Sequence, residues 1–142
     1  MSSIVQGQTT SFKYNLYRGG IFNLSTDSIY MALYTGNANL NSTTTAYSST
    51  NEVVGTGYTA GGQIMTGISI SFDANSGVAY INWNNVVWNP ASFTTRCALI
   101  YDQTASNASI AVIDFGSDKT CSNTFTVTMP ANAYNTALIR SS

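Results

Sequence analysis

The stretch QIMTGISISFDANSGVAYINW, which runs from Gln63 to Trp83, decides the fold class of this chain. In its first part, Gln63–Phe72, isoleucine and phenylalanine fall on one face, and mainly serine and glycine fall on the other. This period of two is typical of a β-strand with one buried face. The next five residues, DANSG, favour a tight turn because Asn and Gly tolerate positive φ angles. The segment Val78–Trp83 then returns, so the stretch predicts an antiparallel hairpin.

Other short apolar segments, separated by turn residues, predict further strands. They are Ser28–Tyr34, Val86–Trp88, Arg96–Tyr101, Ser109–Phe115, Thr124–Met129 and Thr136–Arg140. One short helix is predicted from Ser11 to Gly19, because Phe12 and Leu16 lie four residues apart and glycine ends the pattern.

This pattern predicts a single-domain, all-β antiparallel β-sandwich, with a jelly roll as the specific expectation. Its length of 142 residues fits one domain, and the sequence has no internal repeat. We expect residues 1–10 to form an N-terminal arm and residues 11–142 to form the sandwich. The predicted core consists of Ile29, Met31, Leu33, Ile68, Ile70, Leu99, Phe125 and Val127.

The strand Ser28–Tyr34 is apolar on both faces, which predicts cover on both sides. We expect a neighbouring copy to supply part of that cover, in a symmetric homotrimer. The long segment Thr35–Gly62 and the arm Met1–Thr10 are the candidates for contacts between subunits.

The composition argues against several classes of function. Only 8% of the residues are charged, the net charge is −1, and histidine is absent. Histidine is the side chain that most often serves as general base or metal ligand, so we expect no enzyme, no metal site and no cofactor. The charge balance also offers nothing to a phosphate backbone or an anionic membrane, so neither nucleic acid nor membrane is an expected partner.

The cysteines and tryptophans each leave two interpretations open. Cys97 and Cys121 have no metal or redox spacing, which favours two buried thiols, although the sequence does not exclude a disulfide. Trp83 and Trp88 suit a buried core better than a sugar-binding platform. Tyr47, Tyr58 and Tyr134 lie in polar segments and are candidates for contacts with a partner.

Six runs of residues between Ser11 and Arg140 carry a family resemblance. They are Ser28–Thr35, Thr44–Tyr47, Asn51–Val53, Gly55–Gly62, Ala98–Tyr101 and Asp114–Lys119. These runs resemble a family of small virion proteins from tailed bacteriophages. The resemblance implies a structural component of the virion, with no catalytic residues to carry over. We expect synthesis in the host cytoplasm, because residues 1–8 lack the basic start and apolar region of a signal peptide.

The run Gly55–Gly62, GTGYTAGG, has a physical interpretation of its own. Its four glycines permit backbone conformations that other residues resist, and Tyr58 can anchor the loop in a neighbouring pocket. A phosphate-binding loop is the alternative, but the run lacks the lysine of that motif. The candidate interface therefore consists of Tyr47, Gly55, Gly57, Tyr58, Gly61, Gly62 and Tyr134.

Three functions remain to be separated. The leading hypothesis is a non-enzymatic capsid decoration or cement protein that bridges subunits of the major capsid protein. The alternative is a receptor- or carbohydrate-binding module of a tail or head fibre. A cell-wall hydrolase is the least favoured, because the sequence shows no pair of carboxylates that could act as acid and base. Copy number separates the first two, since hundreds of copies favour decoration and a few or a few tens favour a tail or fibre.

Overall fold

The computed structural model describes residues 3–141 and confirms the all-β class with one short helix. In chain order the elements are β1 (Ser3–Ile4), β2 (Gly7–Gln8), α1 (Thr10–Arg18), β3 (Ile29–Tyr34), β4 (Asn39–Leu40), β5 (Gln63–Ile64), β6 (Ser69–Asp73), β7 (Val78–Asn82), β8 (Val86–Trp88), β9 (Phe93–Asp102), β10 (Ala108–Cys121), β11 (Phe125–Val127) and β12 (Ile139–Ser141).

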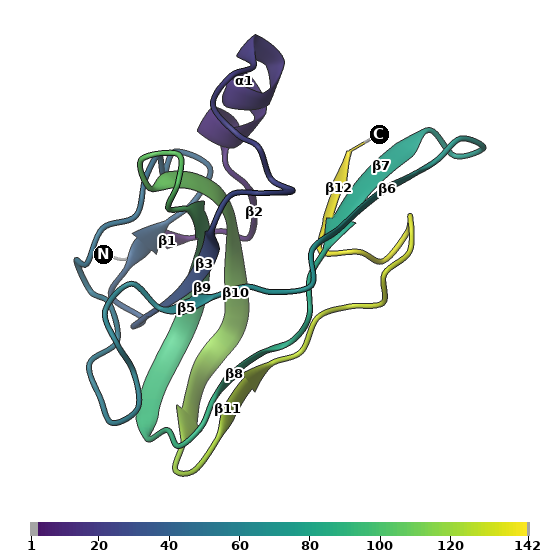
Figure 1. The fold of residues 1–142 in the computed structure, drawn as a ribbon. Helices are drawn as coiled ribbons and strands as arrows, with labels where there is room; N and C mark the ends of the chain where they lie inside the picture. The colour runs from purple at the N-terminus through teal and green to yellow at the C-terminus, as the bar shows by residue number, and fades with distance from the viewer. Residues whose placement is uncertain (1–2, 142) are drawn as a thin grey trace.

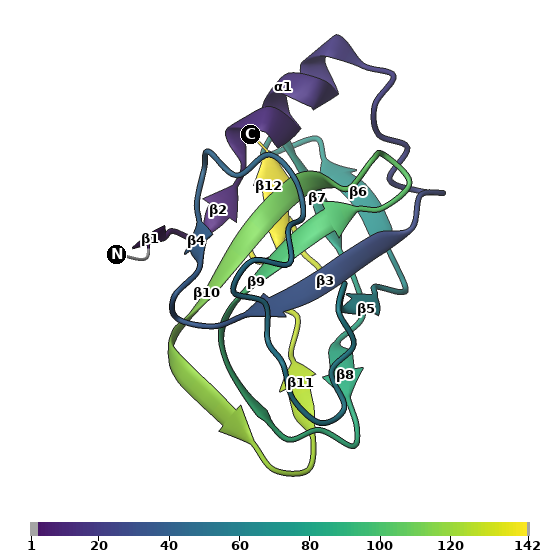
Figure 2. The same ribbon diagram turned by 90° about the vertical axis from the view of Figure 1, so that its left-hand side faces the viewer.

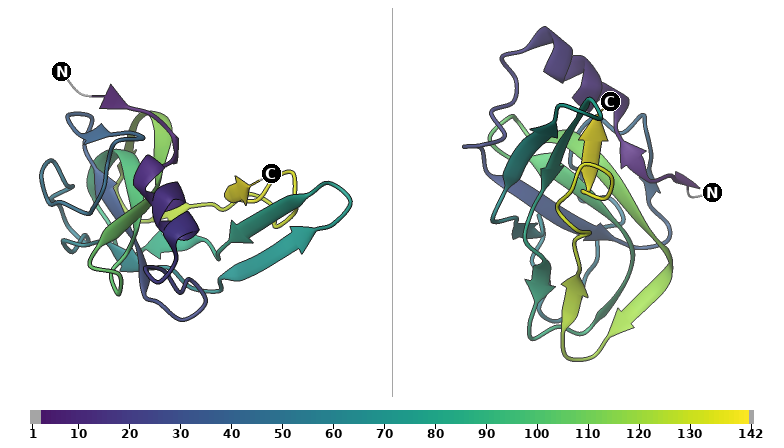
Figure 3. Two further views of the ribbon diagram at one scale, coloured as in Figure 1. Left: turned by 90° about the horizontal axis from the view of Figure 1, so that it is seen from above. Right: turned by 90° about the vertical axis from the view of Figure 1, so that its right-hand side faces the viewer.

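One antiparallel sheet of five strands forms the centre of the molecule, in the order β2-β10-β9-β3-β5 (Figure 2). Its long strands β9 and β10 pair along most of their length, with register shifts between Ser109 and Ala111 and between Asp114 and Lys119. Smaller sheets are built from β8 with β11 and from β12-β7-β6, both antiparallel, while β1 and β4 pair in parallel. The β6–β7 hairpin extends away from the rest of the chain (Figures 1 and 3).

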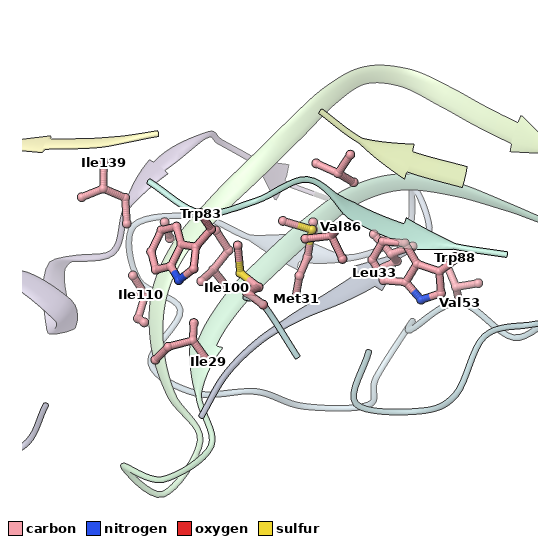
Figure 4. Packing of buried hydrophobic residues seen from close by; sticks show 14 of the residues in the cluster. Ile29, Met31, Leu33, Val53, Trp83, Val86, Trp88, Ile100, Ile110 and Ile139 are labelled. Carbon is pink, nitrogen blue, oxygen red and sulfur yellow. The ribbon is translucent and has the colours of Figure 1, made fainter. Parts of the chain in front are cut away.

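The larger core lies between the five-stranded sheet and the smaller antiparallel sheets. Met31, Leu33 and Ile100 face it from the central sheet, and Trp88 and Ile139 face it from the other side (Figure 4). Both tryptophans are buried, as the sequence predicts. Trp83 is 4% exposed and Trp88 is 1% exposed. This burial removes them from any sugar-binding platform.

A second core covers the opposite face of the central sheet. Ala32, Tyr34 and Leu99 point into it, and Leu40 and Tyr47 from the segment after β3 pack over them. The apolar faces of β3 are therefore both covered within one chain. This corrects the expectation that a neighbouring copy supplies the cover, and it removes one argument for a trimer.

The N-terminal residues belong to the folded body. Ser3–Ile4 pairs with β4, and Gly7–Gln8 pairs with the edge of β10. The helix begins one residue earlier than predicted, because the Thr9 hydroxyl accepts a hydrogen bond from the Phe12 N–H at 3.3 Å and is the N-cap. The predicted glycine stop is confirmed at Gly19. Met1, Ser2 and Ser142 lie outside the described residues.

The expected strand Gln63–Phe72 is wrong as a single element. It divides into β5 and β6, and Gly67 lies in the break with a φ of +67°. A Cβ atom at this position would lie 2.3 Å from the Asn84 side chain. A residue with a side chain would clash there, and the positive φ of the glycine interrupts the strand.

The predicted core is largely confirmed, with one clear error. Ile29, Met31, Leu33, Leu99 and Val127 are buried, and Ile68 and Phe125 pack at the margin of the core. Ile70 is 52% exposed, because β6 extends beyond the end of the core. Cys97 and Cys121 are free, buried thiols.

Candidate functional site: the Glu52 cluster and two exposed surfaces

A buried carboxylate, Glu52, joins three of the seven predicted contact residues. Its Oε1 accepts a hydrogen bond from the Tyr47 hydroxyl at 2.7 Å. Its Oε2 accepts from the Tyr58 hydroxyl at 2.5 Å and from the Gly61 N–H at 2.8 Å. We call Tyr47, Glu52, Tyr58, Gly61 and Tyr101 the Glu52 cluster. The sequence named three of its members, and the cluster joins them through a residue that the sequence analysis did not assign to the interface.

The tyrosines of the cluster tie the 55–62 loop to the central sheet. The Tyr58 hydroxyl also accepts a hydrogen bond from the Leu33 N–H of β3 at 2.9 Å. The Tyr101 hydroxyl of β9 donates to the Gly61 carbonyl at 2.6 Å, and its ring stacks on Tyr47 with a centroid distance of 4.7 Å. The Tyr58 ring itself packs between Trp88 and Phe93 of the core. Tyr58 therefore anchors the loop in a pocket of its own chain.

Two glycines let the loop approach neighbouring backbone closely, Gly57 at Pro90 and Gly62 at strand β3. Gly57 has a φ of +83°, and a Cβ atom there would lie 2.0 Å from the carbonyl oxygen of Pro90. Gly62 has the same φ, and its Cβ would lie 1.8 Å from the carbonyl oxygen of Met31. No L-residue with a side chain fits either position without movement of the backbone. Gly55 is also tight, since its Cβ would lie 2.8 Å from Cβ of Phe93.

The electrostatics of the cluster favour a structural role. Burial raises the pKa of Tyr58 and of Tyr47 above the usual tyrosine range, and the hydrogen bond to Glu52 raises both further. Burial and the charge of Glu52 raise the pKa of Tyr101 to about 12. The phenols thus stay protonated at neutral pH, so Tyr47 and Tyr58 remain donors to the carboxylate and Tyr101 remains a donor to the Gly61 carbonyl. Both oxygens of Glu52 already accept hydrogen bonds from within the cluster.

The cluster presents an exposed surface, which we call the 54–60 surface. Val54 is 96% exposed, and Thr56, Thr59 and Ala60 are exposed as well. The backbone beneath these side chains is held by the Glu52 hydrogen bonds. A partner that binds here meets a loop that is already ordered, which lowers the entropic cost of binding.

Tyr134 lies apart from the Glu52 cluster. It is 43% exposed and lines a groove of about 340 Å³ between β2, β10 and β12. Gln8 crosses this groove, because its side-chain amide donates to the Arg140 carbonyl at 2.9 Å. The predicted interface is therefore divided between two places on the molecule.

The second exposed surface is the projecting β6–β7 hairpin. Ile70 is 52% exposed and Phe72 is 76% exposed. The turn residues predict the hairpin, but the alternation of apolar residues gives no sign that the strand continues beyond the core. Sequence analysis therefore missed this surface.

A pair of carboxyl groups lies outside both surfaces. Asp102 is completely buried at the end of β9, and its Oδ1 accepts the Ala105 N–H at 3.0 Å. Its Oδ2 has no hydrogen-bond partner within residues 3–141. Burial, followed by the neighbouring carboxyl of Asp27, raises the pKa of Asp102 to about 7. The carboxyl has no contact with solvent, so it cannot touch a substrate as a general acid.

Across the described part of the chain, no three Asp, Glu, Cys or His side chains converge on a possible metal site. None of the described helices is both long and apolar enough to cross a bilayer. Comparison with protein-family models, with curated proteins and with solved structures found no match for this chain.

Proposed function

We propose that this protein is a non-enzymatic structural protein of a bacteriophage particle that decorates the capsid and bridges subunits of the major capsid protein. The observation that carries the proposal is the 54–60 surface, a polar and apolar loop without charge, held in place by the buried Glu52 cluster. The resemblance of the sequence to small virion proteins supports the assignment to a particle.

The surface suits repeated contacts between proteins. Fully desolvated charges are costly at an interface unless they are paired, and the 54–60 surface contains none. A preordered loop also binds without first losing chain entropy. These properties favour a protein that covers and joins others. The trimer expected from the sequence stays a prediction, and it loses one of its arguments because the two cores together cover both faces of β3 within one chain.

The finer description of the fold belongs to the same proposal. We infer a jelly-roll-like β-sandwich, supported by a core that packs between the five-stranded sheet and the two smaller antiparallel sheets. A particle map at side-chain resolution tests this description together with the location.

The binding test uses capsids stripped of the protein and purified protein added back. We expect saturable binding, and we expect Val54→Asp to weaken it at least about tenfold because the substitution buries a charge in the contact. Tyr17→Asp is the matched control, since Tyr17 is 90% exposed on α1. Equal binding by the two variants would reject the 54–60 surface, and no binding by the unaltered protein would reject decoration of the capsid.

A fibre module is the competing function, and it predicts binding to cells or glycans. A hydrolase predicts release of fragments from peptidoglycan or capsular polysaccharide. We expect neither result from the purified protein.

A further inference from the structure

The outermost strand of the projecting hairpin, β6, has a free edge. The sheet order is β12-β7-β6, so β7 covers only one side of β6. Among residues 3–141, no backbone group on the other side of β6 pairs with another strand. The hairpin extends into open space in two perpendicular views (Figures 1 and 3). A row of unpaired N–H and C=O groups is a template for another strand.

An apolar row leads from the core to this edge. Ile139 pairs with Ile81, and Ile81 pairs with Ile70, so the three side chains lie side by side on one face of the sheet. Their exposure rises along the row, because Ile139 is 4% exposed, Ile81 is half-buried and Ile70 is 52% exposed. Phe72 lies beside this row on the same face and is 76% exposed. The apolar face therefore stops at β6 without cover.

The edge lacks the features that usually prevent pairing between sheets. Residues 69–73 contain no lysine and no proline, and the five pairs with β7 follow in regular register without a bulge. Asp73 is the only charged residue in β6, and its Oδ2 already accepts the Ser76 N–H at 3.0 Å. The strand therefore carries a single negative charge, at the end beside the turn, and residues 69–72 carry none.

The strand is also complementary to itself. In a twofold antiparallel pair centred on Ser71, Ile70 of one copy faces Phe72 of the other, and Ser71 faces Ser71. Ser69 faces Asp73, so no like charges meet. A shift by one residue would place Ile70 opposite a serine and would mix the apolar face with the polar one.

We propose that β6 pairs with β6 of a second copy of this chain about a twofold axis at Ser71. The two hairpins then form one continuous sheet of six strands, β12-β7-β6 followed by the same strands of the other copy. The apolar row continues across the junction, which covers Ile70 and Phe72. A second copy is the occupant because residues 69–72 are uncharged, Asp73 faces Ser69 and not a like charge, and the edge matches its own sequence in the twofold register. The pairing does not depend on the capsid assignment.

The contact is small. Two strands of five residues each form less than the roughly 800 Å² per partner of a standard interface, so the dimer dissociates on dilution. Sedimentation velocity of the purified chain, from about 1 µM to about 500 µM, measures this equilibrium. The expected result is a monomer at the low end and a dimer at the high end.

Two double variants identify the surface. Ile70→Lys with Phe72→Lys places like charges opposite each other in both pairs, and Ile70→Glu with Phe72→Glu does the same with the other sign. Each variant alone is expected to dimerise at least about tenfold more weakly than the unaltered chain. An equal mixture of the two variants pairs opposite charges and is expected to restore the dimer.

The control carries the same added charge elsewhere. Tyr14→Lys with Tyr17→Lys changes two positions of α1 that are 61% and 90% exposed and lie outside β6, so it should leave dimerisation unchanged. Thermal unfolding of every variant shows whether the fold is retained.

The register has its own test. Ser71→Cys brings two introduced thiols together at the axis, so a short bifunctional maleimide is expected to link the copies. Ser69→Cys faces Asp73 instead and should link several-fold less. A chain that stays monomeric at all concentrations would overturn the proposal. A dimer unaffected by the charged variants, a trimer, or preferred linkage through Ser69→Cys would overturn it equally.

Discussion

Tyr58→Phe removes one hydroxyl that serves two partners in the Glu52 cluster. The hydroxyl donates to Oε2 of Glu52 and accepts the Leu33 N–H. Loss of the hydrogen bond to a charged group costs about 1.5–3 kcal/mol, and a buried N–H without a partner costs about 1–3 kcal/mol. Tyr58 is half-buried, so water can replace part of the loss. We therefore expect the free energy of unfolding to fall by about 2–4 kcal/mol.

Tyr47→Phe is the matched control, because its hydroxyl makes one hydrogen bond to the same carboxylate. We expect it to cost about 1–2 kcal/mol, because only the bond to the carboxylate is lost and water can replace part of it at this half-buried side chain. Urea unfolding, monitored by tryptophan fluorescence, measures the free energy of unfolding of both variants. Trp88 reports on the cluster because the Tyr58 ring stacks on it. Combining each variant with Glu52→Gln in a double-mutant cycle isolates the coupling to the carboxylate. Equal costs for the two phenylalanine variants, or no coupling to Glu52, would refute the role given to Tyr58.

Three further comparisons probe other parts of the fold. Leu99→Ala should lower the free energy of unfolding by about 2–5 kcal/mol because the side chain is completely buried. Ile70→Ala should lower it by less than about 1 kcal/mol in the monomer. Equal losses in urea unfolding would contradict the division between core and projecting hairpin. Gly62→Ala should lower the melting temperature more than Gly20→Ala does. Both positions have a positive φ, but only Gly62 lies against a backbone carbonyl. Comparable melting temperatures would show that the close approach is unimportant. The raised pKa of Asp102 stabilises the protonated native state, and this contribution is complete below the unfolded pKa of about 3.9 and is lost as the pH rises through about 7. Asp102→Asn should therefore match the unaltered chain at pH 4 and be more stable at pH 8, and parallel pH profiles would contradict the raised pKa.

The strand pattern could be predicted from the sequence because period-two alternation and turn residues are local signals. Ile29, Met31 and Leu33 are buried where the alternation places them. The same signal fails at Ile70, since alternation identifies an apolar face but not what covers it. It also fails at Gly67, where a close approach to Asn84 breaks the expected strand.

The contact residues show a similar division. Tyr47, Tyr58 and Gly61 were recognisable as a group by residue type and position in polar segments. Their link to Glu52 depends on how the loop folds back onto β3 and β9, and no spacing in the chain encodes that contact. The cover of β3 was assigned to another copy for the same reason, because the sequence does not show that Leu40 and Tyr47 return over the sheet.

A map of the purified phage particle by cryo-electron microscopy tests the central claim most directly, together with the number of copies of this chain per particle. The proposal predicts hundreds of copies on the outer surface of the capsid, with the 54–60 surface in contact with the major capsid protein. A few copies confined to a tail or fibre, or the absence of the chain from purified particles, would contradict it.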